Sequence, residues 1–194
     1  MTLDDFTAFK TGGFPADYAP NVRRFYSPQD NVHGAIRALL SGATQSIYVS
    51  MYGEDDPELT DIIIKAASDP TIFVQINLDK TQAAGTAEKS LVEKLEGCPA
   101  TRVAVGTSAS GLINHLKMVV CDSLFTLSGS TNWSQGKAGG GEGAGDGKHG
   151  QNNEASIHMD RAIAAEAIRI LTLEHQEMLD QMARWKITVT SPSA

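Results

Sequence analysis

The sequence predicts an α/β protein whose central sheet is mixed, mostly parallel, and flanked by helices on both faces. Two observations lead to this prediction. Segments rich in β-branched and aromatic residues alternate with segments that repeat apolar residues at helical spacing, which is the order expected when helices connect parallel strands. Farther along, two strand-like segments, 115–122 and 124–128, are separated by one residue, and such a short connection implies a tight hairpin.

The first elements follow from local signals. Residues 1–26 show little periodicity and contain paired glycines and two prolines, so we predict an irregular N-terminal arm. A helix is expected to begin at Ser27-Pro28, with the serine as N-cap and the proline in the first turn, and to end at Gly42. Strands are then predicted at 46–52, 71–78 and 101–105, and helices at 57–67 and 87–95.

The last third of the chain contains a low-complexity segment. Gly136 to Gly150 holds eight of the 18 glycines and no apolar residue except alanine, so it cannot bury enough surface to order itself, and we predict a mobile loop. A short strand at 155–157 and a helix from Asp160 to about Trp185 follow. The prediction is one domain over 27–185, with a C-terminal tail at 186–194.

Composition restricts the classes of function. The 194 residues are 41% hydrophobic and 20% charged, as in an ordinary globular protein. A net charge of −7 argues against a broadly basic surface that coats nucleic acid. No apolar run approaches the roughly 18 residues that span a bilayer, and no signal segment is visible. We therefore expect a cytoplasmic protein without stable membrane association.

Five polar residues and one glycine occur at spacings that suit a phosphate-binding site. They are His115, Lys117, Asp122, Gly129, Ser130 and Asn132. Residues two apart on a strand face the same side, so the imidazole and the ammonium of the first two are expected to project together. The lysine would neutralise phosphate charge, the serine and asparagine would donate hydrogen bonds to phosphoryl oxygens, and the glycine would let the backbone approach closely.

This pattern resembles the signature of the phospholipase D superfamily, H-x-K-x4-D-x6-G-S-x-N, at every specified position. From Ser27 to about Asp180 the chain is similar to the small, single-motif branch that includes bacterial endonucleases, and its downstream Asn-x-Glu reads Asn152-Asn153-Glu154. The resemblance implies a phospholipase D/nuclease-like fold. It also implies a phosphodiesterase without metal or cofactor, in which one histidine forms a phosphohistidine and another protonates the leaving alcohol.

The reaction needs two histidines, whereas this sequence contains one motif. We therefore predict a homodimer with one composite site, to which both chains contribute His115, Lys117 and Asn132. Glu154 is expected to orient His115 through its second ring nitrogen. Asp122 is expected to hold the hairpin by hydrogen bonds or an ion pair rather than to take part in the chemistry.

Aromatic residues near the motif are candidate substrate contacts, together with Ser130 and Gly129. Tyr52 ends the first predicted strand, where the edge of a sheet often faces a site. Trp133 follows Asn132 and is expected either to pack in the core or to stack on a nucleobase or lipid. His33 and the acidic segment 54–56 are expected to be structural or solvated.

Three functions remain open at this stage. An endonuclease acting on DNA or RNA is favoured by the small size, the single motif and the lack of a membrane feature. A phospholipase D or transphosphatidylase would need an apolar surface that meets lipid. A catalytically inactive nucleic-acid-binding scaffold would not need the intact His115, Lys117 and Asn132. The residues do not distinguish DNA from RNA or from a smaller phosphodiester.

Overall fold

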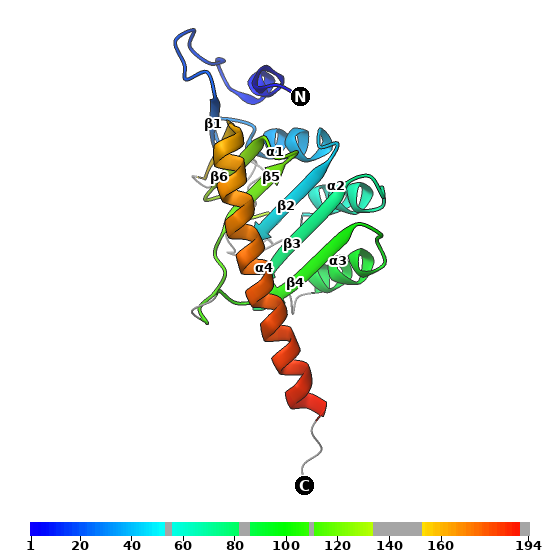
Figure 1. The fold of residues 1–194 in the computed structure, drawn as a ribbon. Coiled ribbons are helices and arrows are strands. Elements are labelled where there is room, and N and C mark those ends of the chain that lie inside the picture. The colour runs from blue at the N-terminus through cyan, green and yellow to red at the C-terminus, as the bar shows by residue number, and fades with distance from the viewer. Residues whose placement is uncertain (53–55, 82–85, 109–110, 134–152, 191–194) are drawn as a thin grey trace.

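A computed structural model of the chain describes residues 1–52, 56–81, 86–108, 111–133 and 153–190. Their strands form one seven-stranded sheet in the order β1-β7-β6-β5-β2-β3-β4 (Figure 1). The strands are β1 (Val22–Tyr26), β2 (Ser46–Met51), β3 (Phe73–Asp79), β4 (Thr101–Gly106), β5 (Lys117–Cys121), β6 (Phe125–Gly129) and β7 (Glu154–Met159). The helices are the 3-10 helix η1 (Leu3–Phe9), α1 (Val32–Ser41), α2 (Pro57–Ala67), α3 (Thr86–Glu96) and α4 (Arg161–Thr190).

The sheet is mixed, as predicted. Strands β2, β3 and β4 are parallel neighbours, and α2 and α3 connect them in the predicted βαβ order. All other neighbouring pairs are antiparallel. Only β5 and β7 run opposite to the remaining strands, so the sheet is mostly parallel in strand direction, although most of its neighbouring pairs are antiparallel. The hairpin accounts for this difference, because it places β5 against β2 and extends the sheet by β6, β7 and β1.

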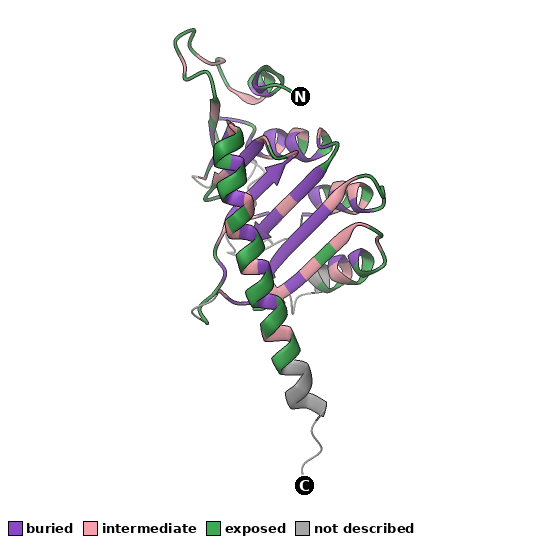
Figure 2. Cartoon of the chain, viewed as in Figure 1, coloured by how far each residue is buried: buried purple, intermediate pink, exposed green. Residues whose placement is uncertain are grey.

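Helices cover both faces, again as predicted. The main core lies between one face of the sheet and helices α1, α2 and α3, and it contains Ile36, Ile63 and Leu91. On the other face α4 crosses the sheet obliquely, and a smaller cluster around Val120 and Leu171 packs beneath it. Figure 2 shows the buried residues concentrated on the strands, with the outer side of α4 exposed.

The N-terminal region is more ordered than the predicted irregular arm. It contains η1 and β1, and β1 pairs with β7 at the edge of the sheet. Only Phe25 of this strand is buried, so β1 lacks the apolar alternation by which a strand is recognised. The next helix does not begin at Ser27-Pro28. It begins at Val32, because Asn31 caps it by accepting a hydrogen bond from the Gly34 backbone N–H.

The C-terminal helix begins where the sequence predicts and ends later. Asp160 accepts hydrogen bonds from the backbone N–H groups of Ala162 and Ile163. The helix continues to Thr190, beyond the predicted end near Trp185, so part of the expected tail is helical.

The predicted loop from Gly136 to Gly150 lies outside the described residues. None of the described helices combines the length and the apolar character that a membrane span requires.

Candidate active site

The motif residues other than Asp122 gather at one edge of the sheet. The strand pairings place the carboxyl ends of β1, β2, β3 and β6 beside the amino ends of β5 and β7. Tyr52 and Asn132 follow strand ends at this edge. Lys117 begins β5, His115 lies two residues before it, and Glu154 begins β7. A crevice at the carboxyl ends of strands is a common place for a ligand site in open α/β sheets.

The imidazole of His115 and the ammonium of Lys117 share one aromatic neighbour. Lys117 is 7% exposed, and its Nζ donates a hydrogen bond of 3.0 Å to the His115 carbonyl oxygen. The same Nζ lies 5.4 Å from the centroid of the Tyr52 ring. The His115 and Tyr52 rings are 5.2 Å apart in an edge-to-face arrangement. His115 itself is exposed, so a buried cation lies beside an accessible imidazole.

His115 does not lie on a strand, because β5 begins at Lys117. Buried side chains fix the preceding residue instead. Asp79, at the end of β3, accepts a hydrogen bond of 2.6 Å from the Asn114 backbone N–H. The Asn114 side chain donates to Ser50 Oγ at 2.8 Å. Asp79, Asn114 and Ser50 are all at most 2% exposed, and sequence analysis did not identify any of them.

The Gly-Ser turn after β6 is joined to the start of β7. An added Cβ at Gly129 would lie 2.1 Å from the Glu154 carbonyl oxygen, so the close approach of the two backbones requires glycine. The Ser130 backbone N–H donates to this oxygen at 3.1 Å, and Ser130 Oγ accepts from the Glu154 backbone N–H at 3.0 Å. Thr131 Oγ1 also donates to the Glu154 carbonyl. These bonds fix the backbone that leads to Asn132.

Asn132 and Trp133 have different surroundings. Asn132 is half-buried, and its Oδ1 atom has no hydrogen-bond partner in the described part of the chain. Trp133 is 2% exposed and packs in the main core. Of the two roles predicted for Trp133, the structure therefore gives core packing. Stacking of this indole on a substrate is incompatible with its burial.

Glu154 is exposed, and across residues 1–52, 56–81, 86–108, 111–133 and 153–190 no hydrogen bond joins its carboxylate to His115. Its role in orienting His115 stays a prediction. The Asp122 carboxylate accepts hydrogen bonds of 2.8 to 3.1 Å from the backbone N–H groups of Thr44, Gln45 and Ser46. It thus ties the hairpin to the segment before β2, away from the edge that carries His115.

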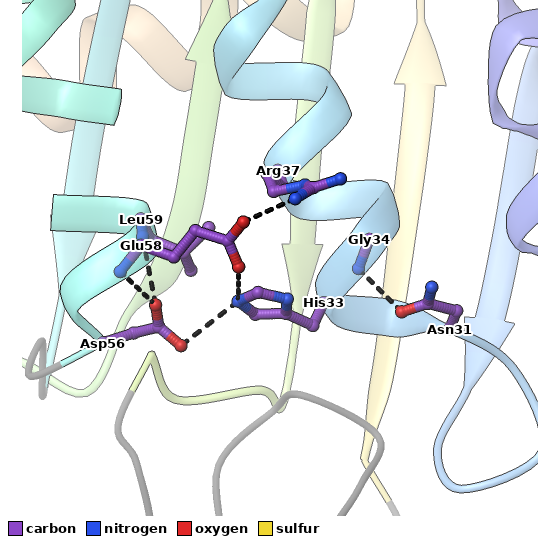
Figure 3. Close-up of polar contacts among 7 residues, drawn as sticks. All are labelled: Asn31, His33, Gly34, Arg37, Asp56, Glu58 and Leu59. Carbon is purple, nitrogen blue, oxygen red and sulfur yellow. Dashed lines mark hydrogen bonds and ion pairs between the residues drawn. The ribbon is translucent and has the colours of Figure 1, made fainter. Parts of the chain in front are cut away.

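A second polar cluster at this edge was not expected. Asp56 is buried rather than solvated, and it caps α2 by accepting hydrogen bonds from the Glu58 and Leu59 backbone N–H groups (Figure 3). His33 Nε2 lies 3.1 Å from Asp56 Oδ2. Burial disfavours the charged carboxylate, but the hydrogen bonds from His33, Leu59 and Glu58 outweigh it and lower the pKa of Asp56. The Asp56 backbone N–H donates to the Trp133 carbonyl, so this cluster adjoins the Asn132 segment.

Among the described residues, no group of three or more His, Cys, Asp or Glu side chains is arranged to hold a metal ion. The ammonium of Lys117 can neutralise a bound anion at this edge, and hydrogen-bond donors such as Ser130 and Asn132 can contact its oxygens.

The chain belongs to the phospholipase D-like family described as "Cardiolipin synthase, PLD-like domain", which it matches over residues 36–169. That stretch contains every motif residue from His115 to Asn132 and also Glu154. The resemblance inferred from the motif is thereby confirmed at the level of the family. No curated protein sequence matches the chain.

Solved structures share the fold at low sequence identity. Nuc from Salmonella typhimurium, a phospholipase D family member, is 16% identical with a TM-score of 0.66, and the match covers 80% of this chain and 94% of that one. NucT from Helicobacter pylori is 20% identical with a TM-score of 0.65, covering 82% and 95%. TrmBL2, an archaeal chromatin protein, is 17% identical with a TM-score of 0.52, covering 82% of this chain and 53% of that one. The predicted fold class is therefore confirmed.

Proposed function

We propose that the protein is a metal-independent phosphodiesterase, and that it is an endonuclease cleaving DNA or RNA at a composite site between two identical subunits. One observation carries the proposal: the buried ammonium of Lys117 lies beside the exposed imidazole of His115, and both contact Tyr52. A cation held in place next to an accessible nucleophile suits attack on an anionic phosphodiester.

In the proposed reaction, the His115 imidazole of one subunit attacks phosphorus and forms a nitrogen–phosphorus bond. The bond to the leaving oxygen breaks, and the His115 of the partner subunit gives that oxygen its proton. This second imidazole, now neutral, removes a proton from water as the water attacks the phosphohistidine. A phosphate monoester leaves, and both imidazoles return to their starting states.

The remaining motif residues have electrostatic roles in this proposal. Lys117 from each chain stabilises negative charge on the non-bridging oxygens, and Ser130 and Asn132 donate hydrogen bonds to them. Asn132 is half-buried beside the Gly-Ser turn, and its amide NH₂ can donate two hydrogen bonds. The net charge of the chain is −7. The negative charge of a phosphate would therefore be neutralised by a few lysine side chains held in the site, and not by a broadly basic surface.

The decisive experiment measures cleavage of DNA and RNA in excess EDTA by the wild type and by His115→Ala. His158→Ala is a matched control, because His158 pairs with Val22 and Thr126 away from the edge that carries the motif. We expect cleavage by the wild type and the control, loss of activity in His115→Ala, and a phosphoryl adduct on His115 after quenching in alkali. Head-group release from phospholipid vesicles without nucleic-acid cleavage would instead support a lipid enzyme. Nucleic-acid binding that His115→Ala leaves intact, without cleavage, would support a scaffold.

A further inference from the structure

A pocket of about 370 Å³ adjoins the start of β7, and its lining has an unusual composition. It is formed by Tyr26, Ser27, Gln29, Asn153 and Glu154. Tyr26 is 43% exposed although it is a large aromatic residue at the end of a strand. The Ser27 backbone N–H donates to the Asn153 carbonyl at 2.9 Å, so the two sides of the pocket are fixed to each other.

The pocket adjoins the motif through the backbone of Glu154, which is one of its lining residues. Tyr26 lies opposite Glu154 in the β1–β7 register, and the Glu154 backbone is hydrogen-bonded to Ser130 and Thr131. A group bound in the pocket therefore lies next to the segment that presents Asn132. This is the position expected for the part of a substrate that adjoins its reacting phosphate.

The chemistry of the lining selects among possible occupants. A second phosphate needs cations that are not already engaged. The lining offers one carboxylate and neither lysine nor arginine, and the two cations beside Tyr26 have partners, because Lys10 pairs with Asp30 and Arg24 interacts with Tyr26, Glu154 and Ser156. An acyl chain needs aliphatic side chains, and the lining has none. An aromatic ring, two amides and a hydroxyl suit a flat, neutral group with a polar edge, and a nucleobase has these properties.

The Tyr26 ring is also held in place. Lys10 Nζ lies 5.3 Å from the ring centroid, and Asp30 fixes this ammonium through an ion pair of 2.7 Å. The Asp30 carboxylate also accepts a hydrogen bond from the Tyr26 backbone N–H. A ring with fixed surroundings loses little conformational entropy when a base stacks on it.

We propose that this pocket is a nucleobase subsite, in which a base next to the scissile phosphate stacks on Tyr26 while Gln29 and Asn153 contact its polar edge. This inference rests on the proposed nuclease function and adds a substrate class to it. A base in this pocket has left its own helical stack, so single-stranded nucleic acid is the preferred substrate.

The test compares an oligothymidylate strand with a strand of the same length built from abasic tetrahydrofuran phosphodiesters, which has the backbone but no bases. Dissociation constants are measured for the wild type, Tyr26→Ala and Tyr26→Phe. We expect Tyr26→Ala to weaken oligothymidylate binding about 5- to 100-fold, as is typical when one stacking residue is removed. Abasic binding should be unchanged, and Tyr26→Phe should bind like the wild type because it keeps the ring.

A second variant, Gln29→Ala/Asn153→Ala, leaves Tyr26 intact and should also weaken oligothymidylate binding alone. Melting temperatures of all variants are compared to identify any loss of folding. The subsite is overturned if the wild type binds both strands equally, or if Tyr26→Ala binds oligothymidylate like the wild type. A wild type that neither binds nor cleaves any strand overturns the nuclease proposal itself, and the subsite with it.

Discussion

Asp79 is a buried residue whose contacts help to fix the position of His115. Its carboxylate accepts a hydrogen bond from the Asn114 backbone N–H, and also from the Thr81 backbone N–H and hydroxyl. Because Asn114 immediately precedes His115, a change at Asp79 shifts the nucleophile without touching the substrate. A displacement of about 1 Å at a reacting group can reduce a rate about 100-fold.

We therefore predict that Asp79→Asn lowers kcat for phosphodiester cleavage at least about 10-fold, with a smaller change in KM. In this variant an amide NH₂ replaces one of the two carboxylate oxygens. At least one of the three donors, the Asn114 N–H and the Thr81 N–H and hydroxyl, then faces another donor instead of an acceptor. Asn77→Ser is the matched control, because Asn77 is equally buried on β3 but hydrogen-bonds to Leu171 of α4 and to His175. Steady-state kinetics below the unfolding temperature measure both parameters. An equal fall in kcat in the two variants would indicate only general destabilisation.

The residues around His115 differ in how far sequence could predict them. Lys117, Gly129 and Ser130 were predicted because their spacing is local and their residue types are specific to phosphate chemistry. Asp79 and Ser50 were not, since they lie 35 and 64 positions from the Asn114 they contact. No periodic pattern reports such a long-range hydrogen bond. Trp133 was left between two roles because an aromatic residue suits both a core and a stacking site.

At the level of elements, the approach of β6 to β7 depends on Gly129. A methyl group there would meet the Glu154 backbone, which cannot move aside like a flexible side chain. We predict that Gly129→Ala destabilises the protein by about 1–3 kcal/mol, as overpacking typically does. It should also reduce activity, because Ser130 and Asn132 move with the strand end. Urea unfolding and cleavage assays check both effects.

Gly97→Ala is the control for this substitution, because nothing lies within 4 Å of an added Cβ at Gly97. It should change stability little and leave activity intact. The interpretation fails if the two alanine variants unfold at the same urea concentration.

The junction of α1 and α2 gives the fold a dependence on pH. Burial opposes ionisation of Asp56, but the hydrogen bonds from His33, Leu59 and Glu58 lower its pKa below the ordinary value of 3.8. The ionised carboxylate therefore stabilises the fold fully when the pH lies above that ordinary pKa. This contribution to the free energy of unfolding is lost as the pH falls through the lowered pKa.

We predict that Asp56→Asn lowers the free energy of unfolding most at neutral pH, and that the difference from the wild type shrinks as the pH falls below that ordinary value. Urea unfolding at several pH values measures it. Asp61→Asn, at an exposed position of the same helix, is the matched control and should change the free energy of unfolding little. A gap between wild type and Asp56→Asn that widens in acid would contradict the assignment.

Elements were predicted best where their stabilising contacts are local. The bounds of α2, Pro57–Ala67, match the predicted helix because a proline and an acidic N-cap mark its start. The strand β1 was missed because its Arg23-Arg24 pair interrupts any apolar pattern, and only its pairing with β7 makes it a strand. The hairpin was predicted, and its turn places Asp122 and Ser123 at positive φ, as in a type I′ turn.

For the whole molecule, the proposed mechanism requires two copies of His115 in one site, and this has a quantitative consequence. Wild-type and His115→Ala subunits, unfolded together in equal amounts and refolded, pair at random. Wild-type dimers then form about one quarter of the population and mixed dimers about one half.

If both imidazoles act on one phosphorus, mixed dimers are inactive. Total activity then falls to about one quarter of that of wild-type protein at the same total protein concentration. Independent sites in each chain would leave about one half. His115 is exposed, so both kinds of subunit should refold alike. Mixing wild type with His158→Ala, which should keep full activity, checks the refolding. A value near one half would rule out the composite site while leaving the fold and its motif untouched.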